Sequence, residues 1–195
     1  MVAYVFDTIL AKGVRAGQVP ARTQDARDWF RNTARRTNTT PSSLIKASDN
    51  YTRAAEPGSM IMFQYDPKLK KQLPYYDTFP VIFVVDSAPN GFYGLNVHYL
   101  PLQQRAMLMD ALYSLTTDQR YDSGTKLKLA YQVLKRSSRF KLFRPCFKQY
   151  LNKHVKSRRV LIEPVEWDIA LFLPLQRFQK ASASQVYADS LKKVG

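Results

Sequence analysis

Cysteine and histidine are scarce in this sequence, and their scarcity excludes several classes of site. The 195 residues contain one cysteine, Cys146, and two histidines, His98 and His154. One cysteine cannot build an internal disulfide framework, and these three residues have no recognised metal-ligand spacing. We therefore expect no metal, no cofactor, and a chain made and kept in a reducing cytosol.

Long apolar runs and familiar catalytic motifs are also absent. No stretch approaches the roughly eighteen apolar residues of a membrane span, and the N-terminus lacks the leading basic region of a signal peptide. The sequence has neither a glycine-rich phosphate loop nor a G-x-S-x-G nucleophile elbow. We therefore predict no membrane contact and no catalytic residue.

What the chain has in excess is positive charge, concentrated in one segment. Thirty Lys and Arg oppose fifteen Asp and Glu, giving a net charge of +15, and residues 119–163 alone hold thirteen cations against two anions. Such a concentration predicts attraction to a polyanion, either DNA or the acidic flank of a neighbouring protein. The residues that we expect to bind it, by neutralising phosphates without reading sequence, are Lys135, Arg136, Arg139, Lys141, Arg144, Lys148, Lys153, Lys156, Arg158 and Arg159.

The length and the 45% hydrophobic content suit one domain with appendages. Residues 1–59 are expected to form an extended arm, a short helix from the Thr23 cap to about Arg36, and a polar linker. The compact core is expected over 60–180, and a closing helix or tail over 181–195. Trp29 and Phe30 either anchor the arm in a partner's groove or pack on the chain's own core.

Within the core, the pattern predicts an α+β fold with a small antiparallel sheet and three to five short helices. Asn90-Gly91 predicts a tight hairpin between two strands, and Pro101 predicts the start of a helix. These strands are also compatible with closure into a small SH3-like barrel. The other expected elements are strands at 60–65, 158–163 and 168–174, a helix at 125–137 and a short helix from Pro145 to His154.

Two enzyme alternatives remain open. Asp66, Asp77 and Asp86 fall near strand ends and would serve a metal-dependent nuclease if they converged, although each also has a role in a turn. PGSMIMFQYDP followed by FPVIFVVD resembles, over about thirty residues, the opening of small SH3-like endoribonuclease toxins. His98 is expected to be structural rather than catalytic, and either exposed or paired, and His154 is expected to suit an anion contact.

A broader resemblance covers about residues 58–180. PGSMIMFQYDPKLKKQLPYYDTFPVIFVVD, FRPCFKQYLNKHVKSRRV and EWDIALFLP resemble segments of small virion proteins of contractile-tailed bacteriophages. The resemblance implies a structural protein without enzymatic activity, assembled in the host cytoplasm. No residue role is carried over.

Two places in such a particle are compatible with the sequence. The first is the head–tail junction, as a head-completion or DNA end protector protein that touches packaged double-stranded DNA. The second is the baseplate or tail hub, where the cations would meet carboxylates of neighbours. In either place the expected partners are other virion proteins in a symmetric assembly.

Overall fold

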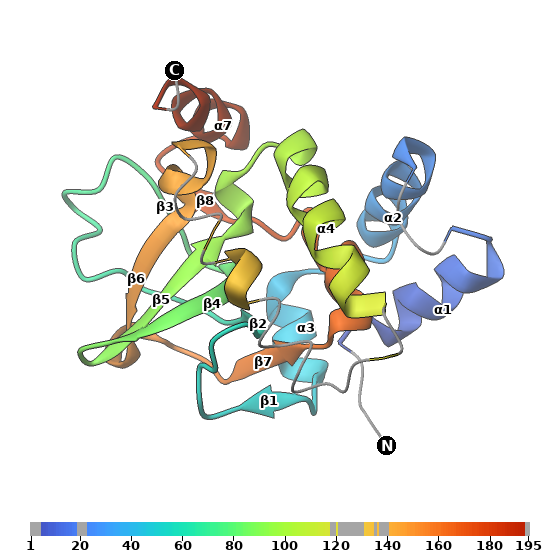
Figure 1. Cartoon of the computed structure of the whole chain (residues 1–195), viewed down its shortest axis with the longest axis horizontal. Helices are drawn as coiled ribbons and strands as arrows, with labels where there is room; N and C mark the ends of the chain where they lie inside the picture. Colours follow the sequence, from blue (N-terminus) through green and yellow to red (C-terminus); the bar gives the residue numbers. More distant parts are fainter. Residues whose placement is uncertain are drawn as a thin grey trace.

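The computed structural model describes residues 5–18, 23–117, 120, 131–134, 136 and 141–193, and its elements confirm the α+β class (Figure 1). The helices are α1 (Asp7–Arg15), α2 (Gln24–Arg36), α3 (Pro41–Ala47), α4 (Leu102–Thr117), α6 (Trp167–Phe172) and α7 (Ala183–Lys192). The strands are β1 (Tyr51–Thr52), β2 (Met60–Met62), β3 (Tyr76–Asp77), β4 (Val81–Ala88), β5 (Gly91–Asn96), β6 (Phe147–Leu151), β7 (Arg159–Ile162) and β8 (Phe178–Gln179). The short 3₁₀ helices are η1 (Val97–Tyr99), η2 (Lys141–Cys146), η3 (Asn152–His154) and η4 (Pro164–Glu166).

The main sheet is antiparallel and has the strand order β1-β7-β2-β4-β5-β6, while β3 and β8 form a separate pair. Strand β7, late in the sequence, lies between β1 and β2, so the sheet joins the two ends of the chain. Within the described residues β1 and β6 are free edges, and no closed SH3-like barrel forms.

The hairpin of β4 and β5 is the element that the sequence indicated most directly. Asn90 has the left-handed φ of 59° that a tight turn requires. Gly91 was expected to share that conformation but serves a different purpose, because a Cβ there would lie 1.9 Å from the carbonyl oxygen of Tyr150. Gly91 therefore allows β6 to approach β5.

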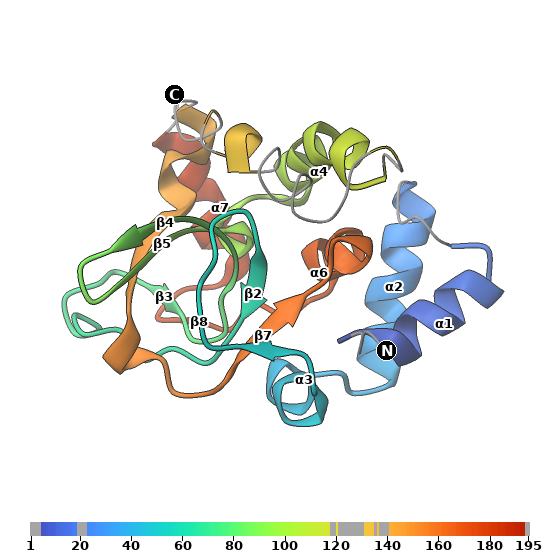
Figure 2. The same ribbon diagram turned by 60° about the horizontal axis from the view of Figure 1, so that its bottom comes forward.

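Both faces of the sheet are buried, as the unbroken apolar run of β4 predicts. On one face, Phe83 packs with Trp167 of α6 and belongs to the larger core under α2, α4 and α6. On the other face, Ile82 and Phe92 belong to a smaller core. Figure 2 shows the helices α2, α4 and α6 gathered on one side of the strands.

The described residues between 5 and 59 form more regular structure than the expected arm and linker. Residues 7–15 form α1 rather than part of an extended arm, and the backbone N–H groups of Val5 and Phe6 donate to the Glu166 carboxylate at 3.1 and 2.6 Å. In the expected linker, Thr40 and Ser43 form a capping box that starts α3. The predicted helix of 24–36 is confirmed, with Thr23 accepting from the Ala26 N–H.

Two later predictions were wrong in type. The segment 168–174 was expected to be a strand but forms α6, whose six residues are all buried, so its sequence has no polar face to show a helical period. The segment from Pro145 to His154 was expected to be a helix, but it continues from η2 into strand β6. Of the helix expected at 125–137, residues 131–134 and 136 are helical and the others lie outside the described residues.

Two further expectations concern the C-terminus and the membrane. Of the closing helix or tail expected over 181–195, residues 183–192 form the helix α7, with Ser182 as its N-cap. In the part of the chain that the structure describes, no helix has the length and apolarity needed to cross a membrane.

Arg105 of α4 connects the helices to the sheet from a fully buried position. Its guanidinium donates to the carbonyl oxygens of Leu100 at 2.8 Å, Leu171 at 2.7 Å and His98 at 3.2 Å, and to the Tyr187 hydroxyl at 2.8 Å. One side chain thereby satisfies acceptors on η1, α6 and α7.

We predict that Arg105→Ala lowers the free energy of unfolding by at least about 3 kcal/mol, because it leaves several buried carbonyl oxygens without donors. Urea denaturation measures this change. Arg36→Ala, which removes an exposed cation, is the control and should change stability by less than about 0.5 kcal/mol. Equal effects of the two substitutions would contradict this role for Arg105.

Candidate nucleic-acid interface

The predicted cations fall into three groups in the structure. Arg136, Lys141, Arg144, Lys153, Lys156 and Arg158 are exposed, Lys148 and Arg159 are partly buried, and Lys135 and Arg139 lie outside the described residues. Arg159 is engaged internally, donating to the carbonyl oxygen of Arg53 and to the side chain of Asn152. The exposed members are therefore the ones available to a partner.

The segments immediately before and after strand β6 carry four of the six exposed members. Lys141 and Arg144 belong to η2 before the strand, Lys153 belongs to η3 after it, and Lys156 follows. Strand β6 is an edge of the main sheet, so these segments lie at the two ends of that edge (Figure 1). We call β6 and these flanking segments, together with the loop 66–75 that lies outside β6, the β6 edge.

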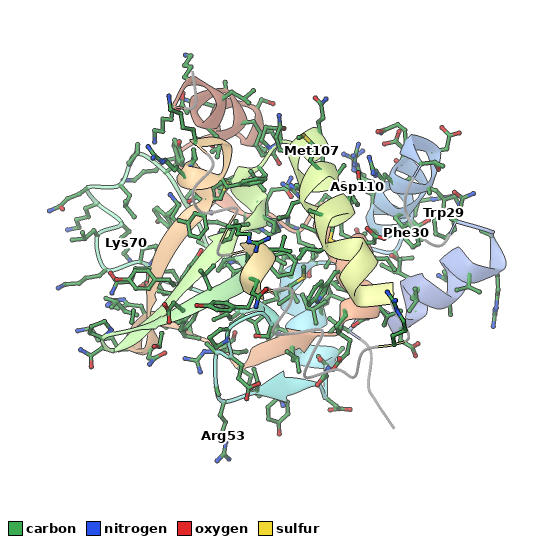
Figure 3. The ribbon with its side chains drawn as sticks, viewed as in Figure 1. Trp29, Phe30, Arg53, Lys70, Met107 and Asp110 are labelled. Atoms are coloured by element: carbon green, nitrogen blue, oxygen red, sulfur yellow. The ribbon has the colours of Figure 1, made fainter. Side chains whose placement is uncertain are left out.

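The loop 66–75 contributes cations that the sequence reasoning missed. Lys68, Lys70 and Lys71 are exposed, and Figure 3 shows Lys70 at the periphery. Lys70 pairs with Asp66, the carboxylate of this loop, at 2.8 Å. The signal was the tight spacing of three lysines, which was obscured because the surrounding segment 57–118 has a net charge of −1.

Lys180 fixes the position of this loop. Its Nζ donates to the carbonyl oxygens of Lys70, Lys71 and Leu73 at 2.7, 3.1 and 2.9 Å. A cation next to β8 thus orders a loop more than a hundred residues earlier. The β6 edge consequently has a defined second wall opposite the strand.

A pocket of about 270 Å³ lies between the loop and β6. Its outer wall includes Lys68, Leu69 and Leu73, and its inner wall is built from β6 and from aromatic residues of neighbouring elements. The complete lining is Tyr65, Pro67, Lys68, Leu69, Leu73, Tyr76, Asp77, Asn96, Tyr99, Lys148, Gln149, Tyr150 and Leu151.

A buried polar network forms the floor of this pocket. Oδ2 of Asp77 lies 2.6 Å from Nδ1 of His98 and 3.4 Å from the Asn96 amide nitrogen. Oδ1 of Asp77 accepts from the backbone N–H groups of Phe79 and Arg177, both at 3.1 Å. His98 is therefore paired rather than exposed, and its side chain is completely buried.

In this pair the environment favours the ionised form of Asp77 and the neutral form of His98. Burial alone would raise the pKa of Asp77, but His98 and the backbone donors hold that pKa below its usual value. Burial lowers the pKa of His98, with Asp77 opposing the shift and Arg105 and Arg177 adding to it. The pair is therefore a carboxylate that accepts from a neutral imidazole, and the unpartnered Nε2 of His98 is then an acceptor rather than a buried N–H.

The three aspartates of the nuclease alternative do not come together. Asp66 pairs with Lys70, Asp77 is enclosed by its network, and Asp86 accepts from the N–H of Ser87 at 2.8 Å. Across the described ranges no three His, Cys, Asp or Glu residues are grouped to hold a metal ion. Asp66 precedes a turn as expected, whereas Asp86 lies inside β4 at a register shift and pairs with Tyr93 rather than opening a turn. Asp77 has a structural role that its position did not reveal.

Trp29 and Phe30 occupy the other side of the molecule from the β6 edge (Figure 3). Phe30 is fully buried in the larger core, and Trp29 packs against it edge-on with ring centroids 5.0 Å apart. Of the two alternatives, the structure has the packing on the chain's own core. Phe30 has no exposed surface to offer a partner in this conformation.

Comparison with known proteins gives one match. A family model described as phage T4 terminal DNA protecting protein matches residues 4–193. No curated protein matches the chain, and no solved structure matches it. The match covers the N-terminal helices, the sheet and α7, and therefore includes the whole β6 edge.

The His98–Asp77 pair predicts a specific dependence of stability on pH. The unfolded chain takes up a proton near the ordinary histidine pKa of 6.5, whereas folded His98 resists it, so stability is lost as pH falls below that value. We expect a lower free energy of unfolding at about pH 5.5 than at about pH 7.5.

His98→Gln should remove this difference, and urea titrations of both proteins at both pH values measure it. Glu166, whose pKa is raised by burial, acts in the opposite direction at lower pH, so the comparison with the variant isolates His98. An unchanged pH dependence in His98→Gln would show that the histidine is not its source.

Proposed function

The chain belongs to the family of the phage T4 terminal DNA protecting protein, and from this we propose that it binds the ends of phage double-stranded DNA through the β6 edge. The main support is that exposed cations lie at both ends of β6, in η2, in η3 and at Lys156, while Lys68 and Lys71 are exposed on the loop 66–75 outside the strand. A backbone of phosphates attracts such a margin by releasing its counterions. The loop carboxylate Asp66 is already paired, so it opposes this attraction little.

The mechanism that we propose is stoichiometric coverage rather than catalysis. A bound protein at a DNA end denies access to enzymes that must load there, and this requires affinity and residence time but no reaction. The cations contact phosphates, which position a protein on DNA without carrying sequence information. Binding is accordingly independent of the sequence near the end.

We further propose that the protein acts in the virion at the head–tail junction, where the end of packaged DNA lies. It would be assembled there with other virion proteins, in a symmetric assembly, after synthesis in the host cytoplasm. The baseplate or tail hub is the alternative position, and there the same cations would meet acidic neighbours. Cryo-electron microscopy density at the neck or at the distal tail distinguishes these positions.

We predict that replacing Lys141, Arg144, Lys153 and Lys156 together with glutamine weakens binding to a linear duplex and flattens its salt dependence. Each lost phosphate contact should reduce the slope of log affinity against log salt by about 0.9. Fluorescence anisotropy across a salt series measures the slope. The matched control replaces four exposed cations of α1 and α2 on the opposite side, namely Lys12, Arg15, Arg35 and Arg36.

The control variant loses the same charge, so it accounts for the general field of the protein. If both variants lose affinity and slope equally, the β6 edge is not the interface. If the β6-edge variant alone loses them, contact with phosphates at this margin is supported.

A second prediction concerns whether the protein distinguishes the ends of linear DNA from internal DNA. The purified protein should slow degradation of a linear duplex by a processive exonuclease, and excess closed circular DNA should compete poorly because it has no ends. Equal competition by linear and circular DNA of the same sequence would reduce the function to general DNA binding.

A further inference from the structure

Lys148 is a cation of this pocket that has no ion-pair partner among the described residues. Its side chain is largely buried, with Nζ 4.4 Å from the centroid of the Tyr99 ring. Among the described residues Nζ has no hydrogen-bond or ion-pair partner, and burial lowers its pKa. Removing an ammonium group from water without a counter-charge is costly, so an unpaired one in a pocket indicates an anionic ligand.

A tyrosine of the same pocket has a proton left to donate. The Tyr65 hydroxyl accepts from the Leu151 N–H at 3.1 Å. Because this oxygen already accepts, its own O–H is available to a ligand, and burial raises the pKa of Tyr65 so that the proton stays in place. The Tyr150 hydroxyl accepts from Asn96 at 3.1 Å and belongs to the floor beside Asp77.

Asp77, the carboxylate in the lining of the pocket, has no oxygen left to bind a ligand. Asp77 uses both oxygens within the floor network, which accepts from Phe79, Arg177, His98 and Asn96. Its charge also repels an anion from the floor. A phosphate therefore fits beside Lys148, towards the mouth where Lys68 lies, rather than at the deepest point.

The size of the pocket limits what can enter. A volume of about 270 Å³ is at the small end of ligand sites and excludes a duplex. A single nucleotide can enter only if its base leaves the base stack of the duplex. The free-energy cost of unstacking is lowest at a DNA end, because the terminal base pair has a stacking neighbour on one side only. The remaining lining, with Leu69, Leu73 and Tyr76, offers apolar and aromatic surface for a base or sugar.

We propose that this pocket binds the terminal nucleotide of a DNA end, with its phosphomonoester held by Lys148 and the hydroxyl group of Tyr65. This inference rests on the proposed function and adds how an end is distinguished from internal DNA. Exposed cations of the β6 edge contact the following backbone. A terminal phosphomonoester carries more charge than an internal phosphodiester and is present only at ends.

The test compares short blunt duplexes of one sequence that carry a 5′-phosphate, a 3′-phosphate or only hydroxyl groups at their ends. The wild-type protein should bind one phosphorylated form about ten times more tightly than the hydroxyl form, a difference typical of a charge-assisted contact. Whether the 5′ or the 3′ form is preferred identifies the strand end that enters. Fluorescence anisotropy provides the dissociation constants.

Lys148→Met should abolish the preference for the phosphorylated form. Lys153→Met is the matched control and should weaken both forms equally, because Lys153 is an exposed cation outside the pocket. The thermal midpoint of Lys148→Met should be no lower than that of the wild type, since the substitution removes a buried unpaired charge. Tyr65→Phe, which removes one donor, should reduce the preference about three-fold.

The outcomes separate this proposal from the function on which it depends. If the wild type protects linear duplexes but binds all end types equally, or if Lys148→Met keeps the preference, the pocket is not the end site although DNA end binding stands. If the wild type does not distinguish linear from circular DNA, the proposed function itself fails. A preference lost in Lys148→Met and Tyr65→Phe but kept in Lys153→Met supports the pocket.

Discussion

The buried carboxylate of Asp77 is the constraint from which much of this structure follows. It accepts from the backbone N–H groups of Phe79, which follows β3, and Arg177, which precedes β8. It also accepts from the side chains of Asn96, at the end of β5, and His98, in η1. The small β3–β8 pair is thereby attached to the main sheet through one side chain. Asn96 extends the connection to Tyr150 on β6, so the floor of the pocket and the edge strand share one network. Such a network is stabilising only when every member is satisfied, because burial makes each missing bond expensive.

The β6 edge combines two kinds of cation with different physical consequences. Exposed lysines and arginines keep their hydration, so in the proposed function they attract DNA at long range, and they contribute little to folding. Lys148 has given up hydration for a position over an aromatic ring, which is the basis of the anion site proposed for it. Functional sites commonly reduce the folding stability of the free protein, and binding of the ligand offsets that loss.

Local structure was predictable where local chemistry determines it. The Thr23 cap, the Asn90 turn and the β-branched run of β4 each carry their own reason for the conformation observed. The errors came where tertiary contacts decide, as in α6, whose uniform burial removes the helical period, and in the N-terminal residues held by Glu166. For the site, the excess of cations was visible in the sequence. The pocket was not, because Lys148, Tyr65 and Tyr99 are brought together only by the fold.

The position of β7 between β1 and β2 has a consequence for how the protein acquires its structure. Tyr51 pairs with Val160 and Met60 with Ile162, and the N–H of Val5 reaches Glu166 across 161 positions of sequence. These pairings require large loops to close before they contribute favourable energy, which slows folding. During synthesis, β1 and β2 cannot form their pairing with β7 until β7 has emerged from the ribosome. The main sheet is therefore completed only after β7 has been synthesised, and a nascent chain interrupted before β7 lacks both a complete sheet and the Lys180 contacts that position the loop 66–75.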